Sequence, residues 1–456
     1  MLPRQNPRHI NFLCESNRSQ QVRELQPSRA YDKMTAMNSD LKHRIRFAGA
    51  FALVVFFIWA GVAAASWSAE ASDHPLLLSS QSKKKAAKKK SAPAKAEKME
   101  GLPPRIPFTS GDQDVAAIPG MPDARFWADS EKEYLRALPQ ERGPWLILST
   151  GGSDGAFGAG LLNGWSKAGT RPEFTLVSGT STGALIAPFA FLGSKYDDAL
   201  RDAYTTIGAI DIFEVGGKGE SFLDTWPLRD LIAKRVTPDL LKAIAAEHAR
   251  GRRLFITTTN LDAGRPVAWD IGAIATHGGD KAVDLVRKVM IASISIPGAF
   301  PPMLIDVEAN GRKIQEMHVD GGLGAQFFVA PDSMLVSTSM ASLRASDLYI
   351  IANMKLGSDF EVTERNTLSI LGRTVAAAIR IVIRNAIDRV YATAKRNNVG
   401  FYLAFVDQGF SAPARGPFDT DYMKALYEAG FAKGSGPHPF LREPPDFSDQ
   451  PRNAAR

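Results

Sequence analysis

The sequence predicts an α/β fold with a largely parallel central sheet, and three observations lead to this prediction. Short apolar runs alternate with longer segments of helical periodicity from residue 145 onward. Glycine-rich turns separate strands from the helices that follow them at 149–155 and 177–183. One helix carries clear boundary residues, with Thr237 as N-cap, Pro238 in the first turn and Gly251 past the end. Alternating strands and helices form parallel sheets with helices on both faces.

The individual elements follow from the spacing of their apolar residues. The predicted strands are short and rich in apolar or β-branched residues: 145–149, 174–178, 253–260, 266–270, 314–320 and 347–354. The predicted helices are amphipathic or apolar at helical spacing: 156–168, 184–192, 238–250, 281–293, 366–396 and 418–431. The folded body would therefore begin near Trp145, and residues 331–456 would complete the sheet and cover the cleft.

Composition and charge narrow the class of protein. The chain is 45% hydrophobic and 23% charged, as is typical of globular proteins. Residues 1–100 carry 17 Lys and Arg against 8 Asp and Glu, whereas the rest carries 38 against 40. The basic charge therefore gives no indication of a nucleic-acid partner for the folded body. Cys14 is the only cysteine, which excludes an intrachain disulfide and a cysteine-based zinc site.

The N-terminal region is predicted to direct or tether the protein. Residues 1–46 form a polar, basic leader in which either Met1 or Met37 is the start. Phe47–Ala69 has no charged residue over 23 positions, and basic residues stand just before it at 42, 44 and 46. Residues 47–71 therefore fit a signal peptide that ends in Ala-Glu-Ala, or a membrane anchor. We expect an exported or membrane-associated protein of the cell envelope.

Residues 72–125 are predicted to be a linker. The stretch 82–100 holds eight lysines among Ala and Pro, a composition too polar and self-repelling to pack a core. A solvated tether is the simplest interpretation. Attraction to anionic lipid headgroups, worth about 1 kcal/mol per lysine near a membrane surface, is the alternative.

Ser181 lies between two glycines in the sequence Gly-Thr-Ser-Thr-Gly at 179–183. A predicted strand precedes it and an apolar helix follows. A nucleophile elbow needs this arrangement, because the flanking glycines allow a strained serine and close packing of the neighbouring elements. The pentapeptide occurs by chance in long chains, so its strand–turn–helix setting carries the prediction that Ser181 is a nucleophile.

A second glycine-rich turn, "STGGSDGAFGAGLL" at 149–162, precedes the helix predicted at 156–168. Backbone N–H groups at such a turn can hold an oxyanion or a phosphate, aided by the helix dipole. A dinucleotide site is disfavoured, since a full GxGxxG would need glycine at Thr150 and the second strand runs into Ser178 rather than an acidic residue.

A catalytic serine also needs a base. Four histidines follow Ser181, and none has a setting that favours this role: His248, predicted at the surface of a helix, His277 in a loop, His318 on a strand and His438 in the C-terminal tail. Asp320 ends a strand and precedes two glycines, which would bring its carboxylate to the sheet edge where α/β active sites gather. A partly desolvated carboxylate can act as the base directly.

Five blocks together resemble the patatin-like phospholipase family: "LILSTGGSDGAFGAGLL", "VSGTSTGALIA", "LFITTTNLDAGRPVAWD", "ASISIPGAFPPM" and "HVDGGL". They occur in the family's order within residues 145–330. The resemblance implies a three-layer α/β/α fold and a Ser–Asp dyad of Ser181 and Asp320. It also implies an oxyanion loop containing Gly151, Gly152 and Ser153. The implied activity is hydrolysis of ester bonds in phospholipids or other acyl lipids, with no metal and no cofactor.

Two positions depart from the family pattern. The loop usually reads GGGxRG, but here Asp154 replaces the arginine. An ionised acid facing the oxyanion would oppose catalysis, so we expect Asp154 to turn away and cap the helix that follows. After Asp320 the family continues with an Asn-rich, Pro-containing stretch, whereas this chain reads "LGAQFF". This second departure concerns the residues that support the dyad.

The expected protein is thus a phospholipase or lysophospholipase that acts at a membrane surface on acyl lipids. Two alternatives stay open. One is an α/β-hydrolase-type esterase with a Ser–Asp–His triad. The other is a catalytically weak, membrane-tethered lipid-binding protein that keeps the fold.

Overall fold

A computed structural model describes residues 102–446, apart from 217–218, 338–342, 359 and 361. All of these residues belong to one compact unit. The predicted leader, the signal or anchor segment at 47–71 and most of the lysine-rich linker lie outside the described residues. No helix in the described part of the chain is long and apolar enough to span a bilayer.

The body is built on a nine-stranded sheet in the order β1-β7-β6-β3-β2-β10-β11, with β9 pairing to β6 and β8 to β9. β6, β3, β2, β10 and β11 run parallel, and the other pairings are antiparallel. The strands are β1 (Arg125–Trp127), β2 (Gly143–Leu148), β3 (Leu176–Thr180), β6 (Arg253–Asn260), β7 (Arg265–Asp270), β8 (Met303–Ala309), β9 (Arg312–Asp320), β10 (Ala345–Ala352) and β11 (Gly400–Phe405). A separate small hairpin joins β4 (Glu214–Val215) and β5 (Leu223–Asp224).

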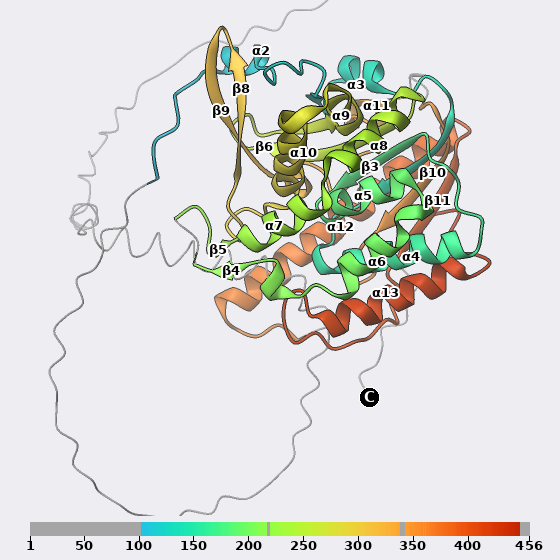
Figure 1. Cartoon of the computed structure of the whole chain (residues 1–456). Helices are drawn as coiled ribbons and strands as arrows, with labels where there is room; N and C mark the ends of the chain where they lie inside the picture. The colour runs from blue at the N-terminus through green and yellow to red at the C-terminus, as the bar shows by residue number, and fades with distance from the viewer. Residues whose placement is uncertain (1–101, 217–218, 338–342, 359, 361, 447–456) are drawn as a thin grey trace, which may run out of the picture. The chain divides into compact units, whose positions relative to one another are not determined.

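Helices cover both faces of this largely parallel sheet, as the sequence predicted (Figure 1). The helices of four residues or more are α2 (Ser110–Val115), α3 (Glu131–Ala137), α4 (Gly155–Lys167), α5 (Thr182–Leu192), α6 (Asp197–Thr205), α7 (Trp226–Arg235), α8 (Pro238–Ala249), α9 (Ile271–His277), α10 (Gly279–Ile294), α11 (Asp332–Val336), α12 (Thr367–Arg396) and α13 (Thr420–Ser435). Short 3-10 turns occur at Gly152–Asp154, Ser194–Tyr196, Ala209–Asp211 and Gly321–Leu323.

The two faces of the sheet have separate cores, because successive strand residues point to opposite sides. Along β2, Leu146 and Leu148 pack into the core beneath α4, α5 and α10. Trp145 and Ile147 pack into the other core, together with residues of α3, α11 and α12. This alternation explains why β2 is apolar along its length, as expected for a parallel strand covered on both faces.

The structure differs from the sequence-based expectation before residue 145. Residues 102–125 were assigned to the linker, but they include α2, and β1 pairs with β7 at the sheet edge. The Arg125 guanidinium forms an ion pair with the fully buried Glu316 of β9. Burial alone would raise the pKa of Glu316, but hydrogen bonds from Arg125 and His318 lower it to about 2. The chain thus packs against the body well before Trp145.

Candidate active site

Ser181 stands at the turn between β3 and α5 in a strained backbone conformation. Its φ of 55° and ψ of −125° lie in a region that non-glycine residues rarely adopt. A Cβ on Gly183 would lie 2.5 Å from the Leu148 carbonyl oxygen, so only glycine allows α5 to start this close to β2. This is the sharp strand-to-helix turn that the glycine spacing predicted.

Asp320 ends β9 and meets Ser181 across the edge of the sheet. The Ser181 hydroxyl donates to Asp320 Oδ2 over 2.7 Å, and the Gly322 N–H donates to Oδ1 over 2.7 Å. Both side chains are buried, and burial raises the pKa of Asp320 to about 6. The carboxylate is therefore ionised at neutral pH, yet more basic than an exposed aspartate.

Ser293 stabilises the turn at Ser181 through two hydrogen bonds. Its hydroxyl accepts the Ser181 N–H over 3.0 Å and donates to the Thr257 carbonyl oxygen over 2.8 Å. The side chain comes from the last turn of α10, within the "ASISIPGAFPPM" block. The sequence predicts no role for Ser293, since nothing in the local pattern indicates what a buried serine contacts.

The glycine-rich turn lies beside Ser181 and follows β2. Gly151 packs on the chain after β10, where a Cβ would come within 2.2 Å of the Asn353 carbonyl oxygen. In the described part of the chain, the N–H groups of Gly151, Gly152 and Ser153 donate to no recorded acceptor. They are thus available to a ligand, as an oxyanion site requires.

Gln326 connects this glycine turn to the loop after Asp320. Its side-chain oxygen accepts from the Thr150 hydroxyl over 2.6 Å, and its amide nitrogen donates to the Gly322 carbonyl over 2.7 Å. Its own carbonyl accepts the Thr150 N–H over 2.9 Å. The "LGAQFF" stretch, which departs from the family pattern, therefore connects the two loops through hydrogen bonds of Gln326.

An apolar cavity opens next to these residues. The cavity has a volume of about 90 Å³. Gly152, Ser153 and Thr182 form the end nearest Ser181, and the remaining lining comes mainly from apolar side chains of α5, α6, α7, α8 and α10. Such a cavity suits a hydrocarbon chain better than a polar ligand.

Residues 146–331 match the family model described as patatin-like phospholipase. This segment is a patatin-like domain. The match supports a lipid ester hydrolase, and the serine, aspartate and glycine turn all lie inside it.

Two solved structures resemble the chain at low similarity. VipD from Legionella pneumophila is 11% identical, with 66% of this chain and 67% of that chain covered and a TM-score of 0.33. The type III effector protein ExoU is 12% identical, with coverage of 66% and 53% and a TM-score of 0.20. No curated protein sequence matches the chain.

In the patatin-like domain, Asp154 does not cap α4, contrary to our expectation. Its side chain makes no capping hydrogen bond to the helix; instead it accepts the Tyr422 hydroxyl of α13 over 2.9 Å. Burial raises the pKa of Asp154 to about 7, and the Tyr422 hydrogen bond partly offsets this rise. Asp154 ends a 3-10 turn and its backbone is already helical, with φ of −71° and ψ of −7°, whereas a residue that caps a helix through its side chain has an extended backbone.

The four histidines downstream of Ser181 bond to neither Ser181 nor Asp320 in the described residues. His318 is fully buried on β9 and hydrogen-bonds to Thr258 and Glu316. His277 pairs with Asp123, and His438 is exposed. His248 was expected at the surface but is partly buried 3.5 Å from Asp270, because α8 packs against α9. None of the histidines in residues 102–446 therefore makes the contact with Asp320 that a triad requires.

Proposed function

We propose that this protein is a serine acyl hydrolase that cleaves ester bonds of phospholipids or other acyl lipids through a dyad of Ser181 and Asp320. The observation that carries the proposal is the 2.7 Å hydrogen bond from the Ser181 hydroxyl to a buried carboxylate, made from a strained turn. Strained serines of this kind expose their Oγ to a substrate carbonyl.

In the proposed first step, Ser181 Oγ attacks the ester carbonyl carbon while its proton moves to Asp320. The negative charge on the former carbonyl oxygen is stabilised by N–H groups of Gly151, Gly152 and Ser153. Collapse of this intermediate breaks the ester C–O bond, and the leaving alcohol takes the proton from Asp320. An acyl group is then bound to Ser181.

In the second step a water molecule attacks the acyl carbonyl, and Asp320 accepts a proton from that water. Collapse releases the fatty acid and returns the proton to Ser181 Oγ. Atoms and charges balance with an ester and water as the only reactants. The apolar cavity lined in part by Gly152 and Thr182 is the proposed site of the acyl chain.

The test is covalent trapping. A fluorophosphonate should label the wild-type protein at Ser181, and Ser181→Ala should abolish both labelling and hydrolysis of a short-chain soluble ester. Labelling at another residue, or hydrolysis that survives Ser181→Ala, would contradict the dyad. Lack of labelling in a folded protein would favour the lipid-binding alternative.

We also propose that Phe47–Ala69 brings the protein to the cell envelope, where its lipid substrates are found. This proposal is supported by the uncharged run and the basic residues before it. The segment lies outside the described residues, so the support comes from sequence alone.

A further inference from the structure

The helix α12 differs sharply between its two halves. In the second half, Ile383, Ile387, Val390 and Ala394 form a buried stripe against the sheet and its neighbours. In the first half, Thr367 to Val382, no residue whose burial is described is buried. The helix nonetheless starts regularly, since the Asn366 side chain accepts the Ser369 N–H over 2.8 Å. The first half is therefore a helical segment with no core of its own.

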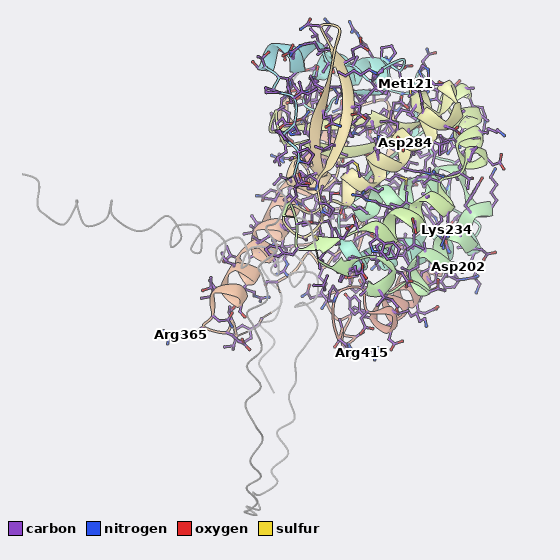
Figure 2. All side chains as sticks on the ribbon, turned by 60° about the vertical axis from the view of Figure 1, so that its left-hand side comes forward. Met121, Asp202, Lys234, Asp284, Arg365 and Arg415 are labelled. Atoms are coloured by element: carbon purple, nitrogen blue, oxygen red, sulfur yellow. The ribbon has the colours of Figure 1, made fainter. Side chains whose placement is uncertain are left out.

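The first half extends from the edge of the sheet that carries Ser181. α12 connects β10 to the parallel strand β11, so it begins at the carboxyl edge and returns to the amino edge. Its 16 residues before Ile383 correspond to about 24 Å of helix, roughly the length of the eight-residue strand β10. Figure 2 shows this end of the helix, next to the label of Arg365, standing out from the body.

The exposed surface of this segment is apolar and basic. Ile370, Ile381 and Val382 are 51%, 58% and 50% exposed. Arginines stand at 373, 380 and 384, and no acidic residue occurs from Thr367 to Ile387.

We propose that the first half of α12 docks on the surface of a bilayer that contains anionic lipid. A helix with apolar side chains beside arginines and no acids lies in the headgroup region, with its apolar residues buried and its cations near phosphates. Docking by this segment brings the carboxyl edge, with Ser181, towards the lipids. The inference deepens the proposed function, because it identifies how the enzyme meets an aggregated substrate.

A local reporter tests this docking without interference from the N-terminal region. The full chain carrying Cys14→Ser and Ile370→Cys is labelled with a polarity-sensitive fluorophore. Vesicles of phosphatidylcholine with phosphatidylglycerol should shift its emission to the blue. Ala249→Cys in the same background is the matched control, since Ala249 is exposed at the end of α8, at the amino edge of the sheet. The control label should stay in water.

Three outcomes would overturn the proposal. The first is an Ile370 label that stays in water when the protein cosediments with vesicles. The second is a blue shift that appears on concentrating the protein without vesicles, which would show that a second copy covers the helix. The third is an equal shift with pure phosphatidylcholine that is insensitive to salt, which would remove the role of the arginines.

Activity assays separate failure of the docking from failure of the proposed function. The variant Ile370→Gln/Ile381→Gln/Val382→Gln should hydrolyse a soluble ester at the wild-type rate but act on vesicles about tenfold more slowly or worse. The control Val115→Gln/Leu135→Gln/Leu441→Gln changes three exposed apolar residues on other parts of the body and should match wild type in both assays. If the wild-type protein does not hydrolyse the soluble ester at all, the result would instead refute the proposed dyad.

Discussion

The hydroxyl of Ser181 and the carboxylate of Asp320 meet over 2.7 Å although 139 positions separate them in the chain. The contact forms because the strands that precede the two residues, β3 and β9, both pair with β6. Ser181 follows the central parallel strand β3, and Asp320 ends β9, which pairs antiparallel to β6. The sheet therefore fixes the positions of both residues.

Ser181→Ala should lower ester hydrolysis by about 10³-fold or more, because it removes the attacking oxygen. The fold should persist, as measured by circular dichroism and urea unfolding. Ser178→Ala is a close control: Ser178 is also buried on β3, and its hydroxyl has no hydrogen-bond partner among the described residues. Comparable loss of turnover in both variants would point to a general disturbance of β3 rather than to a nucleophile.

Asp320→Asn should be nearly as damaging as Ser181→Ala, because an amide cannot accept the serine proton. His438→Ala should keep most of its turnover, since His438 is exposed in the C-terminal region. His318→Ala should lose stability, because it opens the buried network with Glu316 and Thr258, but should retain turnover per folded molecule. Steady-state kinetics with active-site titration makes the comparison. A histidine variant as inactive as Ser181→Ala when folded would favour a triad.

The pH dependence of kcat/KM for a soluble ester should show an acid limb near pH 6. Burial raises the pKa of Asp320 to about 6, and only the ionised carboxylate can act as a base. Activity should therefore rise as the pH increases through this value. Asp154 also has a raised pKa, of about 7, so the profile must be repeated with Asp154→Asn. A limb that disappears in that variant would assign the titration to Asp154.

Asp154→Asn should stabilise the protein at pH 8. The pKa of Asp154 lies at about 7 in the folded state against an ordinary 3.8, so the folded protein keeps a proton that the unfolded chain has lost. The stability linked to this proton is complete below about pH 4 and is lost as the pH rises through 7. Asparagine does not ionise, so it avoids this loss of stability, and its side-chain oxygen can still accept the hydrogen bond from the Tyr422 hydroxyl.

Urea unfolding at pH 4 and pH 8 checks this prediction, with Asp202→Asn on the exposed part of α6 as the control. The difference between the two pH values should shrink for Asp154→Asn and stay unchanged for Asp202→Asn. A lower urea midpoint at pH 8 for Asp154→Asn would restore the capping role that the sequence suggested.

Export is the fifth prediction. A reporter enzyme that is active only outside the cytoplasm, fused after residue 100, should be active when Phe47–Ala69 is intact. Deletion of that segment should abolish the signal while the fusion protein is still made. An inactive reporter on an intact N-terminus would refute the proposed location.

Local sequence patterns predicted much of the fold and of the candidate site. The strand at 253–260 and the cap at Thr237 coincide with the structure because each depends on neighbouring residues. The elbow at Ser181 was predictable for the same reason, since glycine spacing and the flanking apolar runs describe one turn.

Contacts between distant segments escaped prediction. Nothing near Arg125 indicates that it will pair with Glu316, 191 positions away, so residues 102–125 resembled a linker. Asp154 precedes a helix, which made capping the natural expectation, but Tyr422 arrives from 268 positions away. Gln326 gave no local sign of bridging two loops.

The packing of α13 along α4 also has a consequence for biosynthesis (Figure 1). The helix that follows the glycine-rich turn gains its main packing partner only when residues 420–435 have left the ribosome, after most of the chain has been made. Contacts this distant in sequence close slowly, because a long loop must first be ordered. A nascent chain therefore remains open until late in translation, and a product interrupted before residue 420 lacks the support of its glycine turn.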